Sequence, residues 1–400
     1  MTSLLIAGGR IVDPAAPLDS LRDLRIRDGK IAEIGEHLEP APGEEVIDAR
    51  NCVVAPGFVD IHVHLRTPGF PEKETISSGT QAAVRGGFTT VACMPNTQPA
   101  LDDPLVLREL SEEIERHARC RVYPIGAITR GRAGLEACDF AALASAGAMA
   151  FSDDGDTVKD AHLLAEAAMR ARDLRQPFIA HCEPEEAIVA RDLAVAARTQ
   201  KRWHLAHLST AVGVELLRAA RATGTYVTAE VTPHHLTFTE ALFEGQGAAA
   251  KVHPPLRSEA DVKALQAAVR DGTIDAFASD HAPHTAAEKI GDVQRAAPGF
   301  SGLEIAVGAY AAALPGLSLV RFVELLSTNP ARILALDAGR LAIGGPADVT
   351  IFAERPWSVD PATFVSKGKC TPFAGRRLPR RVLATIVGGI VRYRDAECAA

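Results

Sequence analysis

Two histidines and an arginine occupy alternate positions in the stretch GFVDIHVHLR, residues 57–66. Alternate residues of a β-strand point to the same side, about 6.5 Å apart along the chain. His62 and His64 would therefore present two imidazoles to one point, with Arg66 just beyond them. Taken alone, such a pair is more often a half-exposed feature of a strand than a metal site. It predicts a metal site only if further ligands come from elsewhere in the chain.

Further polar residues follow other short apolar runs along the chain. They are Asn96, Asp153, Asp154, His181, His207 and Asp280. Each has an ordinary alternative interpretation, such as a turn, a helix cap or a buried histidine with its own partner. The repetition at strand ends favours metal binding instead, because imidazoles and carboxylates are typical ligands of divalent ions. So many donors predict two ions with a bridging carboxylate and a bridging hydroxide. Zinc is the expected metal, and manganese and cobalt also suit this donor set.

The elements that must position these residues alternate along the middle of the chain. Eight short apolar runs are separated mostly by helical stretches rich in Ala and Leu, such as ETISSGTQAAVRGG and DVKALQAAVRDG. This pattern predicts an α/β fold, a (β/α)8 barrel of the TIM type, over residues 55–340. A doubly wound open sheet is the competing architecture, but the eight units and the lack of a Gly-rich phosphate loop favour the barrel. The C-terminal strand ends then form the rim that carries the active site.

The two ends of the chain have a different pattern. Residues 1–54 and 341–400 contain short β-branched runs punctuated by glycine and aspartate, as in LLIAGGRIVD and RRVLATIVGGIVRYRD. Such runs predict strands and tight turns. We therefore expect both termini to form one small β-sandwich domain beside the barrel.

Composition excludes several classes of protein. The net charge of −7 gives no indication of a nucleic-acid partner. We expect no signal peptide and no membrane span, because no apolar run approaches about 20 residues. The seven cysteines are scattered and never spaced as CxxC, which is typical of reduced thiols in a cytoplasmic protein.

Six motifs together identify a family resemblance. GFVDIHVHLRTPG, GGFTTVACMPNTQP, AFSDDG, HLST, EVTPHHL and ASDHAPHT resemble the type I bacterial dihydroorotases of the amidohydrolase superfamily. The resemblance extends over about residues 3–395. It implies an enzyme that interconverts N-carbamoyl-L-aspartate and (S)-dihydroorotate, a cyclic amide of de novo pyrimidine biosynthesis.

The resemblance also implies a role for each candidate ligand. His62, His64 and Asp280 should hold one metal, and His181 and His207 the second. Many relatives bridge the ions with a carboxylated lysine, but this chain has aspartates at that point. Asp154 is the expected bridge and Asp153 the alternative. Asp280 should also act as the general acid and base, passing the proton of an attacking hydroxide to the leaving nitrogen.

The remaining site residues should contact the substrate. Arg66, Asn96 and His284 match the family's residues that bind the substrate carboxylate. Residues 285–302 read as a loop whose backbone approaches the substrate ring, and the loop includes Pro298 and Gly299. His253 stands where relatives usually have asparagine, and we expect it to replace the amide's hydrogen bond or change selectivity.

The chain departs from the family at a second point, since its segment from His181 to His207 is shorter than the common form. Two other functions compete with the first. One is a related cyclic-amide hydrolase such as allantoinase or hydantoinase, and the other is an inactive scaffold that holds aspartate transcarbamoylase. The expected partners are a small-molecule substrate, a second copy in a homodimer, and aspartate transcarbamoylase.

Overall fold

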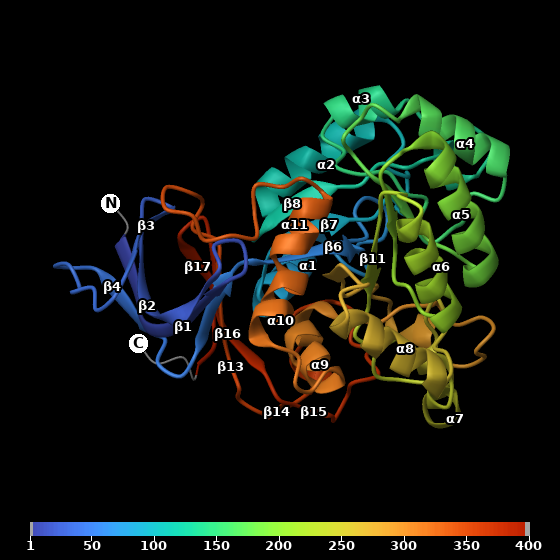
Figure 1. Cartoon of the computed structure of the whole chain (residues 1–400). Helices are drawn as coiled ribbons and strands as arrows, with labels where there is room; N and C mark the ends of the chain where they lie inside the picture. Colours follow the sequence, from blue (N-terminus) through green and yellow to red (C-terminus); the bar gives the residue numbers. More distant parts are fainter. Residues whose placement is uncertain (1–2, 397–400) are drawn as a thin grey trace.

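A barrel and a β-sheet lobe lie side by side in the computed structural model, which describes residues 3–396 (Figure 1). Both ends of the described chain lie in the sheet lobe (Figure 1). Cys398, one of the cysteines expected to be reduced, lies outside the described residues. Within residues 3–396 every helix is too short or too polar to cross a bilayer.

Seven parallel strands form most of the barrel wall. They are β6 (Phe58–Val63), β7 (Phe88–Cys93), β8 (Arg121–Pro124), β9 (Phe178–Ala180), β10 (Trp203–Leu205), β11 (Val227–Val231) and β12 (Ala276–Phe277). The sheets β6-β7-β8 and β9-β10-β11-β12 are each parallel throughout. A parallel bridge between Val63 and His281 joins one pair of ends. The ring confirms the predicted α/β barrel class.

The fourth strand of the ring is a single residue. The run GAMAFSDD was expected to form a strand, but only Phe151 pairs there, with Gly126 on one side and Phe178 on the other. These two parallel bridges close the second gap in the ring. The phenyl ring of Phe151 packs edge-on against the ring of Phe178, with centroids 6.0 Å apart.

Helices cover the outside of the ring. They are α1 (Ile76–Arg85), α2 (Pro104–His117), α3 (Phe140–Ser145), α4 (Ala161–Arg170), α5 (Glu185–Thr199), α6 (Ala211–Ala222), α8 (Glu259–Arg270), α9 (Ala306–Ala313), α10 (Leu319–Leu326) and α11 (Thr328–Ile333). Several begin at residues that cap the free backbone N–H groups. Thr75 with Ser78 and Ser258 with Asp261 form capping boxes at α1 and α8.

The segment from His181 to His207, expected to be short, is α5 followed directly by β10.

Strands from the two ends of the chain form one eight-stranded sheet. They are β1 (Ser3–Asp13), β2 (Leu18–Arg27), β3 (Lys30–Gly35), β4 (Glu45–Asp48), β5 (Val53–Pro56), β13 (Val349–Ala353), β16 (Arg381–Val387) and β17 (Ile390–Arg394). β5 is the junction, because it pairs in parallel with β1 and antiparallel with β13. The sheet has its own apolar core, which includes Leu4, Ile26, Ile47, Val349 and Ile386.

Short elements fill the connections. They are β14 (Trp357–Ser358), β15 (Arg377–Leu378), α7 (Leu242–Gln246), η1 (Arg130–Arg132), η2 (Gly247–Ala250), η3 (Ala286–Lys289), η4 (Leu303–Ile305) and η5 (Pro361–Thr363). η1 follows the third strand of the ring, and η3 follows the eighth. Both therefore lie at the rim where the polar residues gather.

Candidate active site

All six predicted metal ligands meet at the C-terminal end of the barrel. His62 lies on β6, and the others follow the ends of β6, the Phe151 bridge, β9, β10 and β12. They are His62, His64, Asp154, His181, His207 and Asp280, and each is buried. Parallel strands bring their carboxyl ends to one rim, so residues far apart in sequence converge there.

Asp154 lies at the centre of four imidazoles. Its Oδ1 is 3.4 Å from His62 Nε2, 3.4 Å from His181 Nδ1 and 3.3 Å from His207 Nε2. Its Oδ2 is 3.6 Å from His64 Nε2. This is the placement expected of a carboxylate between two ions.

Asp280 contacts the same cluster from the opposite side of the ring. Its Oδ1 lies 3.1 Å from His64 Nε2 and 3.7 Å from His62 Nε2. Two groups have ligand atoms within 4.8 Å of one another, and each suits a metal ion: His62, His64 and Asp280, and His62, Asp154 and His207. The first is the set that the sequence assigned to one ion.

The proton on His62 has one favoured position. Its Nδ1 lies 2.6 Å from Glu230 Oε1, and an ionised carboxylate can only accept a hydrogen bond. In the neutral form that binds a metal, His62 would therefore carry its proton on Nδ1 and direct the Nε2 lone pair toward the cluster. That Nε2 is buried and has no hydrogen-bond partner among residues 3–396, so the donor set fits a metal ion.

Glu230, on β11, is a site residue that the sequence analysis missed. It is fully buried and also contacts His204 Nε2 at 3.1 Å. Burial opposes its charge, but the imidazoles of His62 and His204 outweigh that effect and lower the pKa of Glu230 to about 2. A carboxylate in the middle of the apolar run YVTAEVT was the available signal, because a buried acid needs a partner.

The structure distinguishes the two adjacent aspartates. Asp153 Oδ1 accepts hydrogen bonds from the backbone N–H groups of Ile128 and Thr129, at 2.8 and 3.0 Å. It thereby fastens the loop after β8 to the loop that carries Asp154. Asp154, not Asp153, faces the imidazole cluster.

The cluster carboxylates are ionised despite their burial. Burial alone would raise the pKa of Asp154, but the imidazoles of His62, His181 and His207 hold it well below its usual range. Likewise burial opposes the charge of Asp280, and the bond to His64 and the nearby imidazoles lower its pKa. Both groups are therefore available as metal ligands, and Asp280 as a proton acceptor.

The predicted substrate residues line one cavity of about 260 Å³ beside the cluster. They are Arg66, Asn96, His253, His284, Pro298 and Gly299. Arg66 donates from Nε to the Pro283 carbonyl at 3.2 Å, and its Nη2 lies 3.1 Å from His284 Nε2. Burial lowers the pKa of Arg66 to about 10, which leaves it charged at neutral pH. The cavity thus contains a fixed cation next to the candidate metal centre.

Two of these residues have partners in the protein as well. Asn96 Oδ1 lies 2.8 Å from His64 Nδ1, so the amide fixes the ring that faces Asp280. Burial and the charges of Arg66 and Lys73 lower the pKa of His284 to about 3, so this ring is neutral at pH 7. Each side chain therefore both lines the cavity and orients a neighbour.

The loop after the eighth strand approaches the cavity through its backbone. The Pro298 carbonyl lies 2.9 Å from His284 Nε2, and Gly299 N–H donates to the Lys251 carbonyl at 3.0 Å. Gly299 has φ of 138°, and a Cβ there would lie 2.6 Å from the Ala282 carbonyl oxygen. Only glycine fits this position. His253 lies on the other side, with its ring centroid 6.4 Å from that of His181.

Three of the predicted site residues have a left-handed backbone although they are not glycine. Their φ angles are 56° at Arg66, 31° at His207 and 45° at Asp280. This conformation costs about 1–2 kcal/mol for an L-residue. Such strain persists where the surrounding structure fixes it, and it concentrates at functional sites.

Four further residues that the sequence analysis missed line the same cavity. They are Arg132, Gly155, Asp156 and Ala282. Arg132 lies in the segment TRGRAG, which follows the third apolar run. Its position after a barrel strand was the available signal, since most other strand ends of the ring carry a candidate residue.

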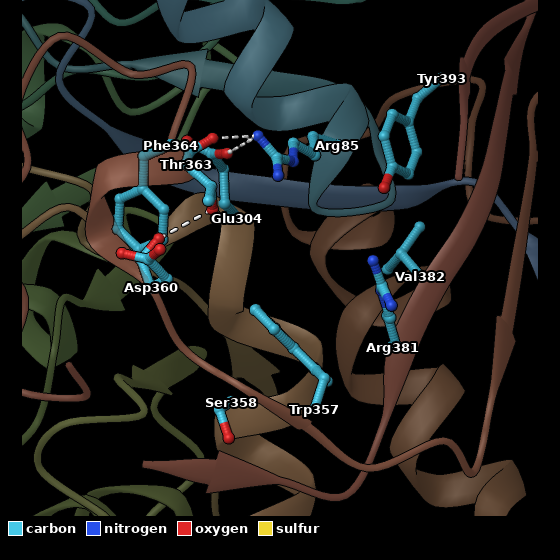
Figure 2. A pocket seen from close by; sticks show the side chains of 10 residues that line it. All are labelled: Arg85, Glu304, Trp357, Ser358, Asp360, Thr363, Phe364, Arg381, Val382 and Tyr393. Atoms are coloured by element: carbon cyan, nitrogen blue, oxygen red, sulfur yellow. Dashed lines mark hydrogen bonds and ion pairs between the residues drawn. The ribbon is translucent and has the colours of Figure 1, made fainter. Parts of the chain in front are cut away.

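A second cavity, of about 230 Å³, lies between the barrel and the sheet lobe (Figure 2). It shares no lining residue with the first. Arg85 points to the Thr363 carbonyl and to Glu304, 3.2 Å away, and Trp357 Nε1 donates to the Arg380 carbonyl at 2.8 Å. These charged and polar groups are satisfied within the protein, so this cavity gives no indication of catalysis.

Comparisons with known proteins identify the family of the chain. Residues 53–391 match the amidohydrolase family. A dihydroorotase of Pelotomaculum thermopropionicum is 45% identical, and the match covers 98% of this chain and 99% of that protein. Dihydroorotases of Anaeromyxobacter dehalogenans and Aquifex aeolicus are 42% and 39% identical, over 98% and 99% of this chain and 98% and 100% of theirs.

Solved structures share the fold. An L-hydantoinase from Arthrobacter aurescens superposes with a TM-score of 0.91 at 24% identity, covering 100% of this chain and 98% of that one. A dihydropyrimidinase from Brevibacillus agri gives 0.89 at 21% identity, covering 100% and 96%. The sequence matches confirm the resemblance predicted from the motifs. The chain belongs to the amidohydrolase family and, within it, to the dihydroorotases, which are cyclic-amide hydrolases.

Proposed function

We propose that this enzyme interconverts N-carbamoyl-L-aspartate and (S)-dihydroorotate by reversible ring closure, a step of de novo pyrimidine biosynthesis. One juxtaposition supports the proposal above others. A cluster of buried imidazoles and carboxylates lines the same cavity as a buried guanidinium, that of Arg66. The substrate has the matching pair of groups, a cyclic amide and a carboxylate.

We propose that two divalent ions occupy the cluster, and the nitrogen and oxygen donors favour Zn²⁺. His62, His64 and Asp280 would hold one ion, His181 and His207 the other, and Asp154 would bridge them. When bound, such ions supply hydroxide near neutral pH and polarise an amide carbonyl. The position of His62 Nε2, buried without a hydrogen-bond partner and 3.4 Å from Asp154 Oδ1, supports this assignment.

The chain's own residues would then orient the ring and move one proton. Arg66 binds the substrate carboxylate through its planar fork, and Asn96 and His284 assist. His253, Pro298 and Gly299 enclose the ring from the other side. Asp280, kept ionised by His64, accepts a proton at Oδ and delivers it to the leaving ring nitrogen.

The first rival function is hydrolysis of a ring without a carboxylate, as in allantoinase or hydantoinase. Such a ring would leave the charge of Arg66 without a partner inside the cavity, which is costly. The second rival is an inactive scaffold for aspartate transcarbamoylase. A chain that had lost its activity would have no reason to keep six buried ligands converging on one point.

The test is to purify the full chain, measure bound metal, and follow ring opening of dihydroorotate beside allantoin and hydantoin. We expect metal in the protein and turnover of dihydroorotate alone. Turnover of allantoin or hydantoin but not dihydroorotate would replace the proposed substrate. A metal-free, inactive chain would support the scaffold.

We further propose that residues 1–54 and 341–400 form the sheet domain and residues 55–340 the catalytic barrel. A cytoplasmic location fits the free thiols of five cysteines: Cys93, Cys120, Cys138, Cys182 and Cys370. A homodimer and a complex with aspartate transcarbamoylase are the proposed assemblies. Light scattering of the chain with and without the transferase would detect either one.

A further inference from the structure

A second arginine reaches the active-site cavity from the loop after β8. Arg132 is the last residue of η1, and it lines the cavity together with Arg66, Gly155 and Asp156. The chain places it close to the metal cluster, because Gly155 and Asp156 directly follow the central aspartate, Asp154. The mechanism derived above gives Arg132 no task.

Arg132 is held in an unfavourable backbone conformation. Its φ is 55°, in the left-handed region, and the preceding Gly131 has φ of 58°. The loop is fastened on both sides, because Gly131 N–H donates to Asp102 Oδ2 at 2.6 Å and Thr129 N–H to Asp153 Oδ1 at 3.0 Å. Glycine would adopt the same conformation freely. The arginine side chain is therefore present at a cost to stability.

The guanidinium of Arg132 is only partly satisfied. Its Nη2 pairs with Asp156, whose side chain is 61% exposed, while only 17% of the Arg132 side chain is exposed. Its Nε is buried and has no hydrogen-bond partner among residues 3–396. A buried donor without an acceptor costs about 1–3 kcal/mol. A strained backbone and an unmet donor on one cavity-lining side chain indicate that its partner is a ligand.

The chemistry of that ligand follows from the charges in the cavity. Arg66 and Arg132 place two guanidinium groups in a space of about 260 Å³. The planar fork of arginine matches the two oxygens of a carboxylate. A ring without charge would satisfy neither group.

We propose that Arg132 is a second substrate-binding arginine, which with Arg66 selects cyclic amides that carry a carboxylate over those that carry none. This inference rests on the proposed function and names a specificity residue for it. Asp156 pairs with Nη2, and the remaining nitrogens, Nε and Nη1, are the ones assigned to the ligand.

The loop provides a matched control. Arg130 belongs to the same short helix, but it pairs with Glu136 at 3.1 Å and is exposed. The variants are Arg132→Met, Arg132→Gly and Arg130→Met. Arg132→Gly removes the guanidinium and also relaxes the left-handed backbone, so it should fold at least as well as the parent. Melting temperature and metal content are measured for each.

The readouts are KM and kcat for dihydroorotate, and the calorimetric Kd of orotate, which has the same ring and carboxylate. For both Arg132 variants we expect KM and Kd to rise at least about tenfold, with kcat within about threefold of the parent. Arg130→Met should match the parent. Uracil, the same ring without the carboxylate, should bind equally to parent and variants.

Three results would overturn the inference. The first is that KM and Kd of both Arg132 variants stay within twofold of the parent. The second is that the variants lose uracil binding as much as orotate binding. The third is that kcat falls while KM and Kd do not change. Orotate binding needs no turnover, so this arm is independent of the activity test. If orotate binds the parent and binds the Arg132 variants more weakly, but the parent does not open dihydroorotate, the proposed reaction is rejected and the anion site is kept.

Discussion

Oε1 of Glu230 lies 2.6 Å from Nδ1 of His62, and both side chains are fully buried. The carboxylate fixes which nitrogen of His62 is protonated, and it makes the other nitrogen a stronger ligand. Glu230 therefore sets the orientation of a ring that belongs to both candidate metal groups.

Glu230→Gln should lower metal affinity by about 10- to 100-fold, because the amide is a weaker acceptor and carries no charge. Metal content after dialysis against a graded chelator measures this effect. Glu215→Gln, an exposed change on α6 at a residue paired with Arg218, is the control. Equal metal retention by both variants would remove Glu230 from the metal centre.

Asp280→Asn should reduce kcat by at least about 100-fold, because the amide cannot accept the proton in transit. The fold should be retained, since the shape of the side chain is kept. Because Asp280 is also a candidate ligand, metal content is measured with the rate. A fully metal-loaded variant that keeps more than a tenth of the parental activity would contradict the proton-transfer role.

Arg66→Met should raise KM for dihydroorotate by about tenfold or more, since a charge-assisted bond to the carboxylate is lost. Arg66→Lys should recover part of that loss, because it restores the charge without the planar fork. Steady-state kinetics of the two variants give the comparison. An unchanged KM in Arg66→Met would take this residue out of the substrate site.

Glu74 should act on Asp280 through the adjacent His281. Glu74 Oε2 lies 3.3 Å from His281 Nε2, and Gly302 N–H donates to the other ring nitrogen at 3.1 Å. Glu74→Ala should lower kcat by about tenfold with little change in KM, because the reacting carboxylate is misplaced rather than the substrate. Glu74→Gln retains an acceptor and should keep most of the activity. Equal losses in both variants would assign Glu74 to electrostatics instead.

The free energy of unfolding should depend on pH through Glu44 in the sheet lobe. Burial opposes its charge, but the Ala41 N–H, the Ser3 hydroxyl and Arg25 lower the pKa of Glu44 to about 2. A lowered pKa in the folded state stabilises the protein above the unfolded value, about 4.5, and this contribution is lost as the pH falls toward 2. Glu44→Gln should therefore be less stable than the parent at pH 7, by about 1–3 kcal/mol. The difference should shrink below pH 4.5 in denaturant titrations. A difference that stays constant with pH would contradict this assignment.

The barrel was predictable from the sequence, because apolar runs that alternate with helical stretches are a local pattern. The ligand histidines were equally visible, because each ends an apolar run. The fourth strand was harder to predict. GAMAFSDD has the composition of a strand, yet only Phe151 pairs with its neighbours. Neighbouring strands decide how many residues of such a run find a partner, and the run itself does not contain that information.

The residues that the sequence analysis missed depend on tertiary neighbours. Glu230 is informative only once His62, on a distant strand, is known to lie against it. Arg132 occupies a segment that reads as a surface turn, and its burial comes from packing at the rim. The choice between Asp153 and Asp154 also required coordinates, because adjacent residues in an extended chain face opposite ways.

The position of β5 in the middle of the composite sheet constrains how the enzyme is made. β5 is synthesised before the barrel, but its partner β13 leaves the ribosome only after the entire barrel. Until then the nascent polypeptide exposes an unpaired apolar strand, a template for association with other chains. Chaperone demand should therefore be greatest late in translation, and premature stop codons before β13 should yield aggregates rather than a shortened enzyme.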